Sequence, residues 1–272
     1  MSREIKTTEP IIQSSKSFDG KHSLIFNDRS HRYKLDGEAC PGVTSVLKAS
    51  YPTSMGLISW MQGESVKYAL NQVEILLEEG IFGELEYPRI IKDSKLAWKE
   101  KAQEAADIGT ITHGYAELYS KGKEIEAGQL LGKITGTTQW PLINSCVEKY
   151  LDWHAHNKGE FISAEGLIAS IDYKYCGKYD LLSKRNGYLV LSDYKTSKGI
   201  YTEQLIQLAA YRLALKEWCD INIDAIEILR FGKEDGEFET RYIYNKNELK
   251  KLEEQAIRCV QTYYFIKEFD KE

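Results

Sequence analysis

The sequence, 272 residues long, predicts a mixed α/β (α+β) protein with a helix-rich N-terminal half and a strand-rich C-terminal half. Two observations support this prediction. Apolar residues recur at helical spacing between positions 57 and 120, whereas short apolar runs bounded by turn residues predominate after position 160. In that second half, the dipeptide Asn186–Gly187 separates two apolar runs, which is a strong sign of a β-hairpin.

The N-terminal half predicts an arm, a hairpin and a series of helices. Residues 1–20 predict a flexible arm, and residues 23–37 predict a β-hairpin. A short helix is expected between Pro41–Gly42 and Pro52, because these residues interrupt regular structure. Longer helices are predicted over 57–79, 93–120 and 139–157. Within 93–120, Gly109 and the β-branched residues after it predict a kink or a helix boundary.

The C-terminal half is organised around the Asn186–Gly187 turn. A strand over 161–171 leads into the hairpin, whose strands are centred on 175–183 and 188–195. A helix is predicted over 204–218, strands over 224–231 and 237–244, and a closing amphipathic helix over 246–269. These elements fit one α/β or α+β domain with a helical insertion.

Composition limits the class of protein without identifying its function. The formal charge of −5 argues against a broad basic surface for nucleic acid, and it leaves room for a local basic groove. No run of about 18 apolar residues is present, so no membrane helix is expected. The polar N-terminus lacks the apolar segment of a secretory signal. The five scattered cysteines favour free thiols in a reducing, cytosolic compartment.

Three charged residues of the hairpin are the first candidates for chemistry. Asp193 and Lys195 lie two residues apart and therefore share one face of their strand. Asp180 lies on the partner strand, and the hairpin can bring it beside them. Burying two carboxylates and an ammonium together is costly, and a hard divalent ion such as Mg²⁺ or Mn²⁺ relieves that cost. An Asp-x-Lys tripeptide alone is common and indicates only a hairpin with exposed charges.

The hairpin and the helix after it resemble the PD-(D/E)XK nuclease superfamily, in particular its RecB-like exonuclease branch. In that branch an Asp on one strand, an Asp or Glu two residues before a Lys on the next, and a Q-x-x-x-Y helix form the active site. Asp180, Asp193, Lys195, Gln207 and Tyr211 match this pattern residue by residue. The resemblance implies a restriction-endonuclease-like core, a central mixed β-sheet flanked by helices, over 93–272. It also implies an N-terminal helical elaboration, with a hairpin and DNA-handling helices over 21–92.

The resemblance further implies the metal ligands. Asp180 and Asp193 would bind Mg²⁺ or Mn²⁺ together with the backbone carbonyl of Tyr194. His113 follows Gly109 at the G-x-x-x-H spacing of the branch, whose His ligates metal, and a neutral imidazole suits a mixed nitrogen and oxygen site.

The other candidates would act around the metal. Lys195 would position or activate the attacking water and stabilise charge on the phosphate. Gln207 would donate to a phosphate oxygen or orient Lys195, and Tyr211 would stack or donate a hydrogen bond. Glu117 shares a helical face with His113, and three roles stay open for it: water-mediated metal contact, orientation of His113, or exposure to solvent. Glu165 is a candidate for indirect contact with the metal, either through a water molecule or through one of the metal's ligands.

The resemblance as a whole implies an Mg²⁺- or Mn²⁺-dependent DNA exonuclease acting on single strands or DNA ends, in recombination, repair or phage DNA metabolism. The expected partners are DNA and recombination or single-strand-binding proteins. The expected place is the cytoplasm of a bacterial cell or phage-infected host, without membrane contact. Two alternatives stay open: a structure-specific or sequence-specific endonuclease, and a catalytically silent DNA-binding or assembly protein. A zinc hydrolase built on His113 and Glu117 ranks lower, because a second ligating histidine at suitable spacing is missing from the sequence.

Overall fold

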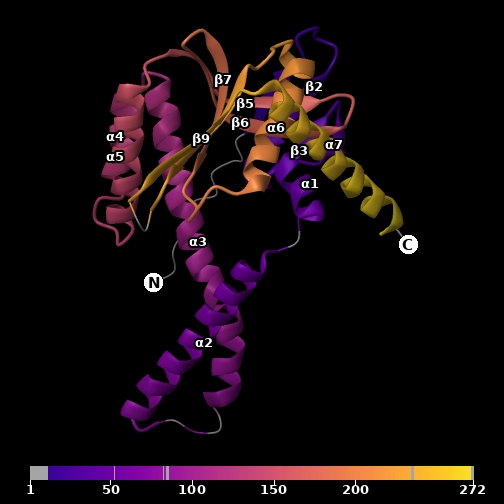
Figure 1. Ribbon diagram of the computed structural model, residues 1–272. Helices are drawn as coiled ribbons and strands as arrows, with labels where there is room; N and C mark the ends of the chain where they lie inside the picture. The colour runs from indigo at the N-terminus through magenta and orange to yellow at the C-terminus, as the bar shows by residue number, and fades with distance from the viewer. Residues whose placement is uncertain (1–11, 52, 82, 84–85, 234–235, 271–272) are drawn as a thin grey trace.

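The computed structural model describes residues 12–51, 53–81, 83, 86–233 and 236–270. These residues form two β-sheets with helices packed around them, and a helical hairpin projects from that body (Figure 1). This arrangement confirms the predicted mixed fold, a central sheet flanked by helices. Of the helices in the described ranges, none combines the length and the apolar character that crossing a membrane requires.

The larger sheet has five strands in the order β5-β6-β7-β8-β9. Strands β7 and β8 are parallel and the other neighbours are antiparallel, so the sheet is mixed, as predicted. Each strand overlaps the range that the sequence predicts for it. The strands are β5 (Glu160–Ser170), β6 (Tyr175–Arg185), β7 (Tyr188–Lys195), β8 (Ala225–Phe231) and β9 (Phe238–Ile243).

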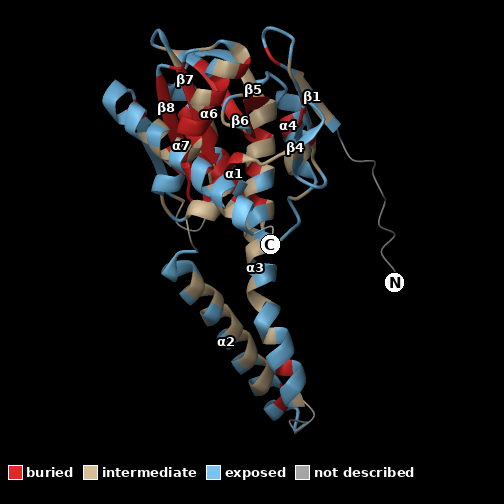
Figure 2. Cartoon of the chain, turned by 90° about the vertical axis from the view of Figure 1, so that its right-hand side faces the viewer, coloured by how far each residue is buried: buried red, intermediate tan, exposed pale blue. Residues whose placement is uncertain are grey.

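Helices cover both faces of this sheet over two separate apolar clusters. In β8, Ile226 and Ile228 belong to one cluster, whereas Leu229 and Phe231 belong to the other. Figure 2 shows the buried residues concentrated at the sheet and at helix α6, which packs on it. The first cluster includes residues of α1 (Val43–Ser50), α6 (Thr202–Cys219) and α7 (Lys246–Phe269). The second includes residues of α3 (Glu86–Ser120), α4 (Glu124–Gly132) and α5 (Trp140–His156).

The smaller sheet is an antiparallel meander, β1-β2-β3-β4, formed by the N-terminal residues. The predicted flexible arm over 1–20 is wrong for 12–16, which pair with β2; residues 1–11 lie outside the described part. Contacts distant in sequence fix this segment: Trp218 Nε1 donates to Ser15 Oγ at 3.0 Å, and Phe18 N donates to the Trp218 carbonyl at 2.8 Å. The strands are β1 (Ile12–Lys16), β2 (Ser23–Asn27), β3 (Arg32–Leu35) and β4 (Glu38–Cys40).

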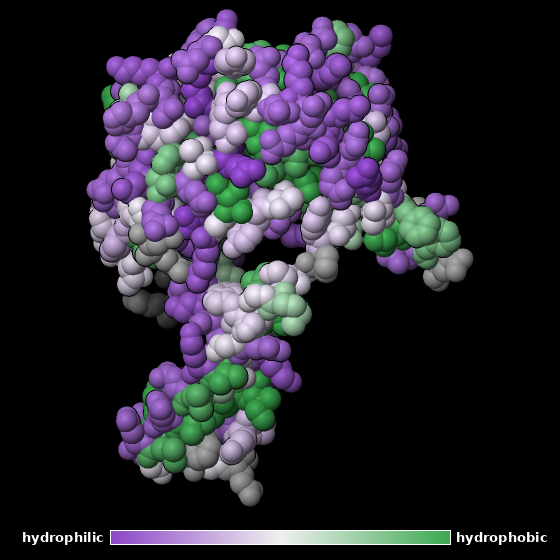
Figure 3. Space-filling view, viewed as in Figure 1, coloured by the Kyte–Doolittle hydropathy of each residue, from purple (hydrophilic) through white to green (hydrophobic). Residues whose placement is uncertain are grey.

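Helix α2 (Met55–Glu78) and the first part of α3 form the projecting hairpin (Figures 1 and 2). The predicted kink or boundary at Gly109 is wrong as a boundary, because α3 is one helix from 86 to 120. The hydroxyls of Thr110 and Thr112 donate to carbonyls four residues earlier, at 3.0 and 2.8 Å, so both β-branched residues fit the helix. The division expected between 92 and 93 falls inside this helix. Figure 3 shows apolar side chains gathered on the hairpin surface.

Candidate metal centre

The β6–β7 hairpin places two aspartates side by side. Its turn residues Asn186 and Gly187 both have positive φ, 50° and 83°, as the tight two-residue turn of a twisted hairpin requires. The turn sets a register in which Leu181 faces Ser192. Asp180 comes one residue before Leu181, and Asp193 comes one residue after Ser192. Both carboxylates therefore lie where the two strands cease to pair.

Helix α3 brings His113 to the same place. Its Nδ1 lies 3.4 Å from Oδ2 of Asp180, and the Tyr194 backbone N–H donates to that same oxygen at 2.7 Å. The close approach of the helix depends on Gly109, at which an added Cβ would lie 3.2 Å from Oγ1 of Thr196. Gly109 therefore lets the helix pack against the loop after β7.

Glu165 of β5 completes a cluster of three ligand groups. One ligand atom each from His113, Glu165 and Asp180 all lie within 4.8 Å of one another. Glu165 has a φ of +57°, a left-handed conformation that costs a residue other than glycine about 1–3 kcal/mol. Its carboxylate is also paired with Lys178. The backbone at Glu165 is thus strained, and the surrounding sheet must hold it in this conformation for the carboxylate to reach the cluster.

Asp193, which is buried, and Lys195, which is partly exposed, form an ion pair beside the cluster. Burial raises the pKa of Asp193 to about 6, against the opposing attraction of Lys195. Burial also acts to lower the pKa of Lys195, but the charges of Asp193 and Asp180 outweigh it and the net shift is upward. Lys195 therefore remains an ammonium, a hydrogen-bond donor with a full positive charge.

The charges of Asp180 and His113 stabilise each other. Burial acts to raise the pKa of Asp180, but His113, Lys195 and the Tyr194 N–H outweigh it, and the net shift is downward. Burial likewise acts to lower the pKa of His113, and attraction by Asp180 outweighs it, so the net shift is upward. Asp180 is thus held ionised at the centre of the cluster.

Gln207 and Tyr211 of α6 form a separate hydrogen-bonded pair. Gln207 Nε2 donates to the Tyr211 hydroxyl oxygen at 2.9 Å. Burial raises the pKa of Tyr211, and the charges of Asp193 and Asp180 raise it further, which places the phenol within their influence. The ring occupies space that Gly177 leaves open, because a Cβ there would lie 2.4 Å from Tyr211 Cε1.

Glu117 lies outside the three-residue cluster. Its Oε1 is 2.5 Å from Nζ of Lys121, one helical turn away, and both side chains are about one-third exposed. Of the three roles left open for Glu117, this geometry favours a partly solvated helix ion pair.

The cluster's donors fit a hard divalent cation. Two carboxylates and an imidazole converge, and oxygen with some nitrogen is the donor set that Mg²⁺ and Mn²⁺ accept. Sequence reasoning gave Glu165 only a secondary place and missed its partner Lys178. Its central position depends on the left-handed backbone at 165, for which a glutamate gives no sequence signal.

A comparison with known protein families agrees with this geometry. A family model described as the PD-(D/E)XK nuclease superfamily matches residues 87–264. No curated protein matches the chain. Among solved structures, one from Eubacterium rectale, described as a candidate exonuclease, is 12% identical with a TM-score of 0.38, and the match covers 59% of this chain and 68% of that one. The protein SSO0001 is 14% identical with a TM-score of 0.30, and the match covers 58% of this chain and 74% of that one. The chain belongs to the PD-(D/E)XK nuclease superfamily.

Proposed function

We propose that this protein is a metal-dependent DNA exonuclease of the RecB-like branch, which hydrolyses phosphodiester bonds in single strands or at DNA ends. One observation carries the proposal: the His113–Glu165–Asp180 cluster lies beside the Asp193–Lys195 ion pair, where β6 and β7 separate. A set of metal ligands next to a fixed ammonium is the arrangement that hydrolysis of a phosphodiester needs.

The ligand residues have the first role in this proposal. His113, Asp180, Asp193 and the Tyr194 carbonyl hold Mg²⁺ or Mn²⁺, and Glu165 joins them directly or through water. When bound, the ion supplies positive charge that offsets the charge developing on the phosphate. The ion pair of Glu165 with Lys178 and the Tyr194 N–H bond to Asp180 orient these carboxylates before any ligand arrives.

Lys195 and the α6 pair have the second role. The Lys195 ammonium, kept charged by Asp193 and Asp180, donates to the attacking water or to a phosphate oxygen in a largely buried site, where its attraction for the phosphate is stronger than in water. Tyr211 keeps its proton because burial raises its pKa, so its hydroxyl remains a donor. Gln207 holds that hydroxyl in place. A role in recombination, repair or phage DNA metabolism, with recombination or single-strand-binding proteins as partners and a cytoplasmic location, belongs to the same proposal.

The experiment is degradation of end-labelled single-stranded and double-stranded DNA, with a closed circular single strand as control. Wild type is compared with Asp193→Asn and with Asp152→Asn, whose carboxylate is 74% exposed on α5. Each is assayed with Mg²⁺, Mn²⁺ or EDTA. The proposal expects metal-dependent loss of linear strands, abolished in Asp193→Asn and kept in Asp152→Asn.

Other outcomes assign other functions. Cutting of the circular strand would show an endonuclease on the same core. DNA binding without cleavage of any substrate would show a catalytically silent DNA-binding protein. Full activity in EDTA would contradict the metal-dependent mechanism.

A further inference from the structure

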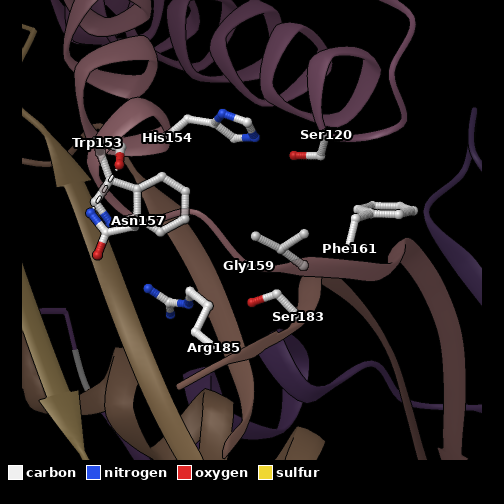
Figure 4. Close-up of a pocket in the computed structure, with 9 residues that line it drawn as sticks. Ser120, Trp153, His154, Asn157, Gly159, Phe161, Ser183 and Arg185 are labelled. Atoms are coloured by element: carbon white, nitrogen blue, oxygen red, sulfur yellow. Dashed lines mark hydrogen bonds between the residues drawn. The ribbon is translucent and has the colours of Figure 1, made fainter. Parts of the chain in front are cut away.

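A second candidate site lies between α5 and the β5–β6 pair, apart from the His113–Glu165–Asp180 cluster, which is called the metal cluster below. It is an open depression whose empty space, with the solvent at its mouth included, is about 330 Å³. Figure 4 shows side chains from α3, α5, β5 and β6 arranged around a common space. The residues that matter for its chemistry are Ser120, Trp153, His154, Phe161, Ser183 and Arg185.

Two buried polar atoms face this pocket without a partner. Ser183 is 6% exposed, and its Oγ has no hydrogen-bond partner among the described residues. The Arg185 side chain is 10% exposed, and its Nε likewise lacks an acceptor within the described part of the chain. A buried polar group left unpaired costs about 1–3 kcal/mol, so a ligand that reaches either atom gains by supplying the missing partner. Together they offer one N–H donor and one hydroxyl that donates or accepts.

The pocket is nearly neutral in charge. The other guanidinium nitrogens of Arg185 are paired with the Glu227 carboxylate, which Ser192 Oγ also contacts at 2.8 Å. Burial lowers the pKa of His154, which favours its uncharged imidazole. Among the lining residues that the structure describes, Arg185 alone carries a permanent charge. A neutral lining disfavours a phosphate group as the occupant and favours an uncharged polar ligand.

Two aromatic rings, Phe161 and Trp153, form part of the lining. Phe161 is 39% exposed and offers an open ring face at the rim. Trp153 is buried, and the Arg185 guanidinium lies 5.2 Å from its ring centroid, which holds both side chains in place. Gly159 lets the chain pass over Arg185, because a Cβ there would lie 2.4 Å from Arg185 Cγ. The pocket is therefore built from a fixed floor and an exposed aromatic wall.

We propose that this pocket binds a nucleobase of the substrate strand, with the ring against Phe161 and its polar edge toward Ser183 and Arg185. A nucleobase is a flat, uncharged ring that carries hydrogen-bond donors and acceptors, which is the combination that the lining offers. That the base belongs to a DNA strand rests on the proposed nuclease function. That the pocket binds a base rests on the pocket's own residues.

Three elements carry residues of both the pocket and the metal cluster. On α3, His113 and Ser120 are two turns apart and share a face, about 10 Å along the helix. On β6, Ser183 follows Asp180 by three residues, about 10 Å along the strand, and the two side chains leave opposite faces. On β5, Phe161 precedes Glu165 by four residues, about 13 Å. Because Asp180 and Ser183 leave opposite faces of β6, a strand with a phosphate at the cluster reaches the pocket by passing around β5, the edge strand of the sheet, over about 10–13 Å.

The test measures binding in EDTA, where cleavage is absent. An oligonucleotide series with one abasic position at a time keeps every phosphate and removes single bases. In wild type, one position is expected to lose about 5- to 150-fold in affinity, the range for stacking of one base on an aromatic side chain. In Phe161→Ala, Phe161→Leu and Ser183→Ala, that loss should shrink. Phe265→Ala, which removes a ring 63% exposed on α7, should leave it unchanged.

A second arm uses deoxyadenosine, thymidine and inorganic phosphate as separate ligands. Nucleoside binding that weakens in Phe161→Ala supports the pocket even if the protein cleaves no DNA. Equal abasic losses in wild type and variants, with no nucleoside binding, would overturn the proposal while leaving the nuclease function intact. Competition by inorganic phosphate alone would overturn it in favour of an anion site. Circular dichroism and thermal unfolding confirm that each variant is folded.

Discussion

Gly177→Ala tests whether the close packing of Tyr211 on β6 positions the α6 side of the site. The added Cβ would lie 2.4 Å from Tyr211 Cε1 and 3.0 Å from Cδ1, where carbon atoms prefer about 3.5–4.0 Å. The ring or the strand must therefore move by about 1 Å. Gly177 does not adopt positive φ, so alanine meets no backbone strain there and the whole effect is steric.

We expect this variant to lose about 1–3 kcal/mol in the free energy of unfolding, the usual cost of overpacking a buried site. Urea denaturation measures the loss. Gly63→Ala is the matched control, because a Cβ at this α2 position meets nothing within 4 Å and should stabilise the helix by about 0.5–1 kcal/mol. The cleavage rate of Gly177→Ala should fall on the order of 100-fold, because displacement of about 1 Å disturbs a catalytic arrangement.

A double-mutant cycle with Tyr211→Ala makes the reasoning refutable. With the ring absent, Gly177→Ala should cost little or become slightly stabilising. An equal cost in both backgrounds would show that the tyrosine ring is not what limits position 177. A single variant as stable as wild type would show that the site adjusts without strain.

Three further predictions concern charge and strain. Mn²⁺ at about 100 times its dissociation constant should stabilise the protein by about 2.7 kcal/mol in thermal unfolding, and Asp180→Asn should remove this gain; a persistent gain would place the ion elsewhere. Arg185→Met should cost about 3–5 kcal/mol in urea denaturation because it leaves the buried Glu227 carboxylate without its cation, whereas Arg258→Met, in an exposed pair with Glu254, should cost less than about 1 kcal/mol. In EDTA, Glu165→Gly should raise the free energy of unfolding by about 1 kcal/mol by relieving left-handed strain, while cleavage falls; a loss of stability would refute the strain.

The sequence predicted the hairpin well because its signals are local. Asn186–Gly187 specifies a two-residue turn with two positive φ angles, and the turn in turn sets which residues of β6 and β7 face each other. Asp180 and Asp193 had to become neighbours once that register was set. Adjacency of the two carboxylates was therefore predictable from the spacing of 13 residues in the chain.

Other features depend on contacts distant in sequence. Ile12–Lys16 carries no strong strand pattern, and it forms β1 because β2 and Trp218 supply its partners. Gly109 looked like a helix breaker, whereas its role is close packing of α3 on the loop after β7. Helix α4 (Glu124–Gly132) was not predicted, and it packs mainly on α3.

The pocket at Arg185 also lay beyond sequence reasoning. Its floor combines Trp153 from α5 and Arg185 from β6, whose guanidinium is paired with Glu227 from β8, and these residues share no motif. Only the folded sheet brings these three side chains together. Motif spacing thus predicted the candidate ligands of the metal cluster, whereas tertiary packing determines which surfaces lie around it.

The most direct test of the account separates catalysis from metal binding at Lys195. Wild type and Lys195→Ala are compared in two measurements, cleavage of linear single-stranded DNA and Mn²⁺ binding by calorimetry. In the proposed mechanism the ammonium acts on the reacting groups and is not a ligand, so the variant should lose at least about 100-fold in cleavage rate while still binding Mn²⁺. Cleavage at the wild-type rate with the ammonium removed would contradict the proposed site.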